Sequence, residues 1–91
     1  MLSRELRKYI STIIEPCGEG RNLVVMLKPS TKNTVIEKVT SRLEEIIVQT
    51  KVMTKGYYRG IEITIYSSGK LLLKNVRSRE IGERILAELL Q

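Results

Sequence analysis

The sequence lacks several residue types on which most catalytic sites depend. Its 91 residues include no histidine and no aspartate, and Cys17 is the only cysteine. Metal sites, nucleophile triads and carboxylate pairs draw on these residue types. The composition therefore predicts a protein that is not an enzyme. It predicts no catalytic residue, no metal site, no cofactor and no small-molecule substrate.

Other absences concern the core and the cellular compartment. Without Trp or Phe, the core has to be aliphatic. One cysteine cannot form an internal disulfide, so we expect a cytoplasmic protein in which Cys17 is an ordinary loop thiol. No apolar run approaches the length of a membrane span, and the N-terminus lacks the apolar region of a signal peptide, so we expect no membrane contact. Abundant Ile, Lys, Glu and Arg fit a thermophile.

Positive charge is the most prominent feature that the sequence does have. It holds 16 Lys and Arg residues against 10 acidic ones, a formal net charge of +6. Between residues 51 and 77 a single acid, Glu62, accompanies six basic residues. These are Lys51, Lys55, Arg59, Lys70, Lys74 and Arg77. A basic stripe on one face of a sheet indicates contact with phosphates, and a merely solvated surface is the alternative.

Residues 59–78 predict a β-hairpin that leads into a helix. Three isoleucines alternate with more polar residues from residue 61 to residue 66, the period of a strand with one buried face. A three-residue loop over 67–69 sets Ile65 opposite Leu71 and gives Gly69 the left-handed backbone conformation that such loops need. A two-residue loop would instead place a lysine on the isoleucine face.

The three-residue loop sorts the hairpin into two faces. The core face contains Ile61, Ile63, Ile65, Leu71 and Leu73. The second face contains Glu62, Thr64, Tyr66, Lys70, Leu72 and Lys74. Because the second face is basic and carries an aromatic residue, we expect the function to lie there.

The hairpin carries a resemblance to a known family. Residues 65–70 read Ile-Tyr-Ser-Ser-Gly-Lys, and Arg77, Ser78 and Glu80 open the following helix. This segment, within a match over about residues 52–90, resembles one repeat of the TATA-box-binding protein. The N-terminal domain of type 3 ribonuclease H has a similar hairpin. The resemblance implies a TBP-like half-saddle, with Tyr66 where the family has an aromatic residue that wedges into DNA. The family has two repeats in one chain, and this chain has room for one.

A second resemblance covers more of the chain but depends on element order alone. Strand, helix, hairpin and helix follow one another as in the small dimerising subunit of the KEOPS tRNA-modification complex. That subunit is similar in length. This resemblance implies a homodimer or a subunit of a larger archaeal-type complex.

The remaining elements complete a prediction of an α+β fold. We expect an amphipathic helix from Leu2 to Glu15, a strand from Asn22 to Lys28, a long helix from Ser30 to Gln49 and a strand from Thr50 to Tyr58. Ser78 caps the last helix, in which Gly82 either marks the close approach of another element or is simply tolerated. The long helix is expected to bury Val35, Ile36, Val39, Leu43, Ile46 and Ile47, with Thr34 and Glu37 as a capping box or with Ser30 or Thr31 as an earlier cap. The prediction is one domain over residues 1–91, with an N-terminal helix in 1–15 and a strand–helix–strands–helix body over 22–91. It consists of a curved antiparallel sheet with helices packed on one face.

Two functions compete on this evidence. The leading hypothesis is a non-catalytic nucleic-acid-binding module or accessory subunit that binds DNA or RNA. The six basic residues of the stripe would contact phosphates, and Tyr66, Tyr57 or Tyr58 would stack or wedge. The second hypothesis is a protein-interaction or dimerisation subunit, with Leu23, Val25, Met53 and Leu72 at the interface. Basic residues along one groove would favour the first hypothesis, and an apolar band across the sheet would favour the second.

Overall fold

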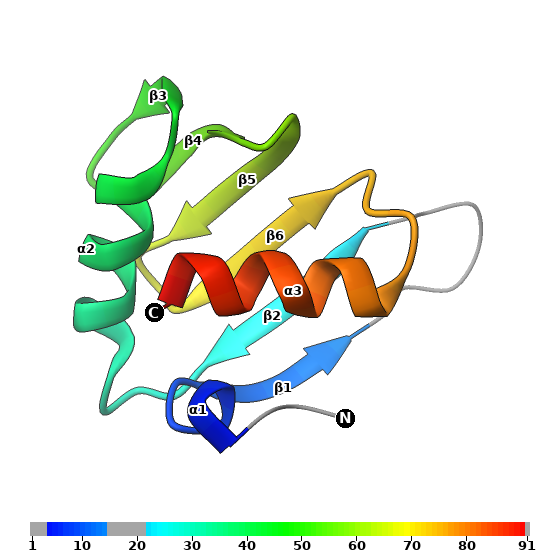
Figure 1. Ribbon diagram of the computed structural model, residues 1–91. Coiled ribbons are helices and arrows are strands. Elements are labelled where there is room, and N and C mark those ends of the chain that lie inside the picture. Colours follow the sequence, from blue (N-terminus) through cyan, green and yellow to red (C-terminus); the bar gives the residue numbers. More distant parts are fainter. Residues whose placement is uncertain (1–3, 15–21, 91) are drawn as a thin grey trace.

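The computed structural model describes residues 4–14 and 22–90 and is an α+β fold, as predicted (Figure 1). The strands are β1 (Ile10–Ile14), β2 (Leu23–Leu27), β3 (Glu45–Gln49), β4 (Met53–Tyr58), β5 (Ile61–Tyr66) and β6 (Lys70–Lys74). The helices are α2 (Lys32–Arg42) and α3 (Arg79–Leu90), and α1 (Arg4–Arg7) is a single turn. The strands form one six-stranded sheet in the order β1-β2-β6-β5-β4-β3, in which every neighbouring pair is antiparallel.

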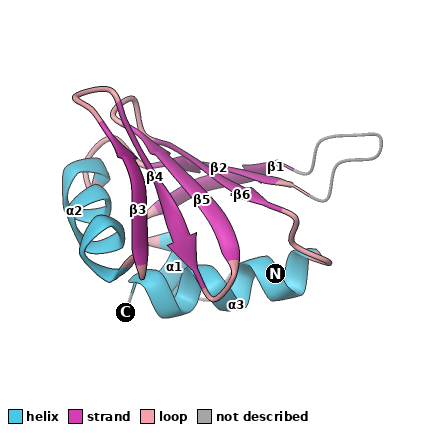
Figure 2. Ribbon diagram, turned by 90° about the horizontal axis from the view of Figure 1, so that it is seen from above, coloured by secondary structure: helices cyan, strands magenta, loops and turns pink. Residues whose placement is uncertain are grey.

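The helices pack on one face of the sheet, and the core between them is aliphatic (Figure 2). The hairpin contributes Ile63, Ile65, Leu71 and Leu73 to this core, all of them fully buried. The helices contribute Val35 and Val39 from α2 and Ile85, Leu86, Leu89 and Leu90 from α3. Each such side chain stabilises the fold by about 1.5–3 kcal/mol on burial. In the described part of the chain, no helix is long and apolar enough to span a membrane.

The β5–β6 hairpin has the predicted register. Ile65 lies opposite Leu71 and Ile63 opposite Leu73, so these four side chains share the core face. The amide of Gly69 donates to the carbonyl of Tyr66 at 3.0 Å, and Gly69 has a φ of 102°. The three-residue loop with a left-handed glycine is therefore confirmed.

The predicted N-terminal helix is wrong. After the single turn of α1 the chain enters β1, which pairs with β2; Leu2 and Glu15 lie outside the described residues. Residues 10–14 read Ile-Ser-Thr-Ile-Ile, and β-branched residues favour a strand when a partner strand is available. Strand β2 is that partner, and it lies between β1 and β6. The apolar side chains of Leu6, Ile10 and Ile13 are buried in the protein's own core.

The long helix predicted from Ser30 to Gln49 is correct only in its first part. Helix α2 ends at Arg42, Leu43 is extended with ψ 135°, and residues 45–49 form β3. The Ile-Ile-Val run of residues 46–48 favours a strand, and β4 supplies a partner. Ile46 and Ile47, which were predicted to be buried, are exposed. The helix begins at Lys32, so neither Thr34 nor Glu37 is at its cap.

Helix α3 begins as predicted, and its two ends are held by different contacts. The Ser78 hydroxyl accepts a hydrogen bond from the Ile81 amide at 3.2 Å, which confirms it as the cap. Within the helix, a Cβ at Gly82 would collide with Leu23 of β2, which confirms the predicted close approach. At the other end, the side chains of two α2 residues reach α3 carbonyls: Lys38 donates to Leu90 at 3.2 Å and Arg42 to Glu88 at 2.6 Å.

Candidate interaction surface

The sheet face opposite the helices is the candidate site, and we call it the open face. The strand registers place its side chains in alternation with those of the core. It carries Thr12, Ile14, Val24, Met26, Glu45, Val48, Met53, Lys55, Tyr57, Glu62, Thr64, Tyr66, Lys70, Leu72 and Lys74. In the described part of the chain, no helix covers it (Figure 2). The predicted functional face of the hairpin is thus part of a larger surface to which four other strands contribute.

Tyr66 and Lys70 flank the hairpin loop and lie against each other on the open face. The Lys70 ammonium lies 5.5 Å from the centroid of the Tyr66 ring. Met53 is opposite Tyr66 on β4, and Met26 is opposite Lys70 on β2. The aromatic ring and the cation are therefore set between two flexible apolar side chains, an arrangement that adapts to a flat ligand.

Lys55 lies on β4 between two tyrosines of the open face. It is opposite Thr64, and Tyr57 follows it on the same face of β4, opposite Glu62. Tyr57 and Tyr66 are separated by four residue positions along the strands, which is about 13 Å at the usual rise of a strand. Lys55 forms no ion pair with any described residue, so its charge remains available to a ligand at the middle of this interval.

Lys74 is on the open face, but its charge is balanced. Its ammonium lies 3.2 Å from Oε2 of Glu62, the residue opposite it on β5. That oxygen is buried and accepts no hydrogen bond within the described structure, so Lys74 is its compensating charge. The Lys74–Glu62 pair therefore contributes less to an anion site than Lys55 or Lys70.

Three of the predicted phosphate-binding residues lie away from the open face. Lys51 is in the exposed turn between β3 and β4, and Arg77 is in the exposed segment before α3. Arg59 is in the two-residue β4–β5 turn, with φ 51°, and its Nε lies 2.6 Å from Oε1 of Glu88 on α3. A hydrogen bond with Tyr58, and then the charge of Glu88, raise the pKa of Arg59 above its ordinary value. Arg59 thus belongs to the helix side of the molecule.

The three candidate tyrosines also divide between the two sides. Tyr66 and Tyr57 are on the open face, whereas Tyr58 points to the helix side. The Tyr58 hydroxyl donates to Glu88 Oε1 at 2.9 Å. Tyr58 is therefore a structural residue, and the open face presents two rings.

The residues predicted at a protein interface fall into two groups. Leu23 and Val25 are instead buried in the protein's own core. Met53 and Leu72 are on the open face, half-buried. Leu72 is opposite Val24, and Val24 is opposite Ile14, so these three form an apolar row across β6, β2 and β1. The open face therefore combines an apolar half with an aromatic and basic half.

Lys32 is a residue that the sequence reasoning did not connect with the site. Its methylene carbons lie against Gly69, beside Lys70. The contact depends on the pairing of β2 with β6, in which the Leu27 amide donates to the Gly69 carbonyl at 2.8 Å. No local sequence pattern indicates this pairing, because residues 27 and 69 are far apart in the chain. Lys32 lies at the start of α2, on the helix side of the hairpin loop, and forms no ion pair with any described residue, so it adds a third lysine beside this loop.

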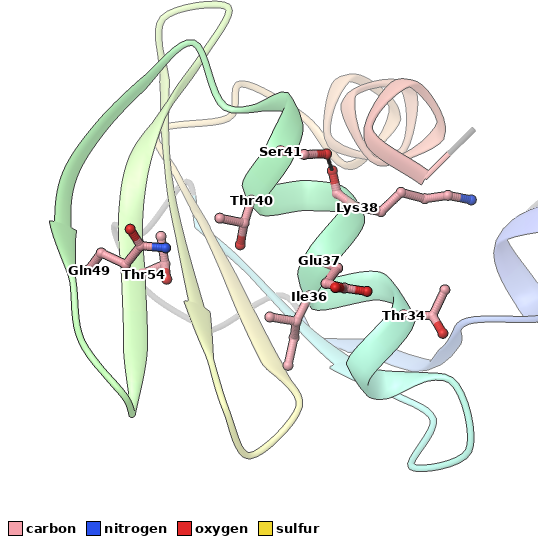
Figure 3. A pocket seen from close by; sticks show the side chains of 8 residues that line it. All are labelled: Thr34, Ile36, Glu37, Lys38, Thr40, Ser41, Gln49 and Thr54. Atoms are coloured by element: carbon pink, nitrogen blue, oxygen red, sulfur yellow. Dashed lines mark hydrogen bonds between the residues drawn. The ribbon is translucent and has the colours of Figure 1, made fainter.

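A pocket lies on the helix side, between α2 and the strands β3 and β4 (Figure 3). It is open and has a volume of about 730 Å³. Its lining consists of Thr34, Ile36, Glu37, Lys38, Thr40 and Ser41 of α2 with Gln49 and Thr54 of the sheet. The Ser41 hydroxyl is already engaged, since it donates to the Lys38 carbonyl at 2.8 Å, and Figure 3 shows the Lys38 side chain pointing away from the strands. Within residues 4–14 and 22–90, no group of three or more acidic or cysteine side chains is arranged to hold a metal ion.

Comparisons with protein-family models, with curated proteins and with solved structures found no match to this chain. We therefore infer function from the residues of the open face.

Proposed function

We propose that this protein is a non-catalytic module that binds single-stranded DNA or RNA on the open face of its sheet. The observation that carries the proposal is the placement of Lys55 between Tyr57 and Tyr66. Bases stack on exposed aromatic rings, and a lysine between two stacking positions contacts the phosphate that joins the bases. Lys70 and Lys32 supply further positive charge at the Tyr66 end. The resemblance of the hairpin to a TATA-box-binding-protein repeat supports the same face.

We expect the electrostatic and the stacking contributions to binding to respond differently to salt. Three unpaired lysines that neutralise about three phosphates of a single strand give a slope of log K against log salt of about −2. Stacking contributes roughly 1–3 kcal/mol per base and responds little to salt. Tyr66→Ala and Tyr57→Ala therefore weaken binding without changing the slope. Lys70→Ala and Lys55→Ala weaken binding and flatten the slope by about 0.7 each.

The test is a salt titration of the full chain against labelled single-stranded DNA, RNA and duplex DNA. Tyr58→Phe is the control for the tyrosines, because Tyr58 points to the helix side. Arg84→Ala is the control for the lysines, because Arg84 is exposed on α3 and its substitution also removes one positive charge. The proposal fails if the wild type binds none of the three nucleic acids at low salt. It also fails if Arg84→Ala weakens binding as much as Lys70→Ala.

The apolar row of Ile14, Val24 and Leu72 favours a second candidate function, a protein-interaction subunit. A partner that covers this row would bury it, as in a KEOPS-like dimerising subunit or an accessory subunit of a replication or transcription enzyme. Leu72→Lys would then abolish partner binding, whereas it would leave or strengthen binding to nucleic acid. The mass of the native complex isolated from the source cell, for the wild type and for this variant, distinguishes the two functions.

A further inference from the structure

Exposed apolar side chains of the described residues gather at one edge of the sheet. Ile46, Ile47 and Val48 of β3 are 44%, 47% and 37% exposed, and Val52 in the following turn is 65% exposed. Ile14, on the opposite edge strand, is the fifth exposed large apolar residue in the described part of the chain, at 47%. Such a concentration on a small protein marks a surface that another molecule covers.

The backbone of β3 is also open on its outer side. Among the described strands, β3 pairs with β4 alone, so its second edge presents unpaired amide and carbonyl groups. Proteins usually protect such an edge with charged residues, proline, a bulge or a covering element. Both edge strands here have a bulge, but β1 presents Ser11, Thr12 and one isoleucine, Ile14, to solvent, whereas β3 presents two isoleucines and a valine. The β3 edge is therefore the less protected of the two.

The charges at the two ends of β3 fit a second copy of the same strand. Glu45 is at the N-terminal end, and Lys51 follows shortly after the C-terminal end. In an antiparallel pair of identical strands, the beginning of one strand lies beside the end of the other. The two Glu45 carboxylates are then far apart, and each is near the Lys51 ammonium of the other copy. The apolar residues 46–48 meet in the middle.

We propose that the β3 edge is a self-association surface, at which a second copy of the chain pairs antiparallel through its own β3. The two six-stranded sheets then continue into one another across a twofold axis. This contact uses the strand edge and leaves the open face free, so it does not depend on the proposed function. It satisfies the outer backbone groups of β3 and removes its exposed apolar side chains from water.

The central test compares two substitutions of the same residue type at the same exposure. Ile47→Lys introduces a charge into the β3 edge, and Ile14→Lys introduces it into the β1 edge. The readout is molar mass by light scattering or sedimentation across a concentration series, with circular dichroism as the check on folding. We expect the wild type and Ile14→Lys to be dimeric. We expect the dissociation constant of the Ile47→Lys dimer to be raised by roughly tenfold or more, because an unpaired charge in a strand pair is costly.

A charge exchange tests the antiparallel orientation by itself. Glu45→Lys and Lys51→Glu each place like charges together in the dimer and weaken it, whereas the double variant restores opposite charges and recovers the association. Both substitutions are at exposed positions, so we expect all three variants to fold. A wild type that stays monomeric at high micromolar concentration overturns the proposal. The proposal is also overturned if Ile47→Lys still dimerises, if Ile14→Lys does not dimerise, or if the double variant does not recover the association.

Discussion

The backbone carbonyl oxygen of Glu45 occupies the space that a side chain on Gly56 would take. Gly56 is in β4, opposite Ile46 of the edge strand, and a side chain at this position would also meet the side chain of Leu43. The missing side chain lets β3 approach β4 closely at the point where the chain turns from helix α2 into the sheet. The position of the edge strand thus depends on one glycine.

We expect Gly56→Ala to lower the free energy of unfolding by about 1–3 kcal/mol, because the added methyl group meets backbone rather than a movable side chain. Gly60→Ala is the matched control. Gly60 has no neighbour near the added carbon, but its φ of 77° is unfavourable for alanine. Its cost is about 1–2 kcal/mol. Urea denaturation measures both, and amide exchange distinguishes them, since Gly56→Ala alone accelerates exchange across the β3–β4 pair.

The Lys74–Glu62 pair predicts an unequal effect of two lysines on nucleic-acid binding. Lys70→Ala removes an unbalanced charge, and Lys74→Ala removes one that Glu62 already neutralises. We therefore expect Lys74→Ala to weaken binding less than Lys70→Ala, and Glu62→Gln to strengthen it by releasing Lys74. The measurement is the affinity of each variant for the same oligonucleotide at one low salt concentration. Equal losses for the two lysine variants would contradict this assignment.

Ser78→Ala is expected to lower stability by about 1 kcal/mol, because the Ile81 amide loses its capping acceptor at the start of α3. Ser68→Ala, in the exposed hairpin loop, changes the same atoms and should alter stability by less than about 0.5 kcal/mol. Thermal or urea unfolding of the two variants gives the comparison.

The contacts of Lys38 and Arg42 with the last carbonyls of α3 place two positive charges at the negative end of a helix dipole. We expect the double variant Lys38→Ala/Arg42→Ala to lose about 1 kcal/mol of stability, because each exposed charge contributes roughly 0.3–1 kcal/mol there. The loss should shrink in 1 M salt, where such interactions are screened. A loss that is independent of salt would indicate packing rather than charge.

The sequence predicted the β5–β6 hairpin well because its signal is local. Alternation of apolar and polar residues defines the faces, and Gly69 defines the loop, so Ile65 and Leu71 could be paired without knowledge of other elements. The two edge strands were missed for the opposite reason. Ile46 and Ile47 follow Leu43 at a spacing that also suits a helix, and the available partner strand decided the outcome. The N-terminal residues 10–14 were misread in the same way.

The site was predictable in part for similar reasons. Tyr66, Lys70 and Lys74 were placed on one face correctly because the hairpin register fixes them. The five consecutive apolar residues of β2 do not tell which side faces inward, so Leu23 and Val25 were assigned to a surface although they are in the core. Arg59 could not be placed, since a left-handed turn conformation directs it to Glu88 on a distant helix.

The position of β2 between β1 and β6 has a consequence for how the chain folds. Leu23 pairs with Leu73, so one side of β2 finds its partner near in sequence, in β1, and the other side finds it fifty positions later, in β6. Such long-range pairing makes folding slow compared with that of helical proteins of the same size. During synthesis, the edge of β2 that will pair with β6 has no partner strand until β6 has left the ribosome. This interval, rather than the finished fold, is when the chain is most exposed to aggregation.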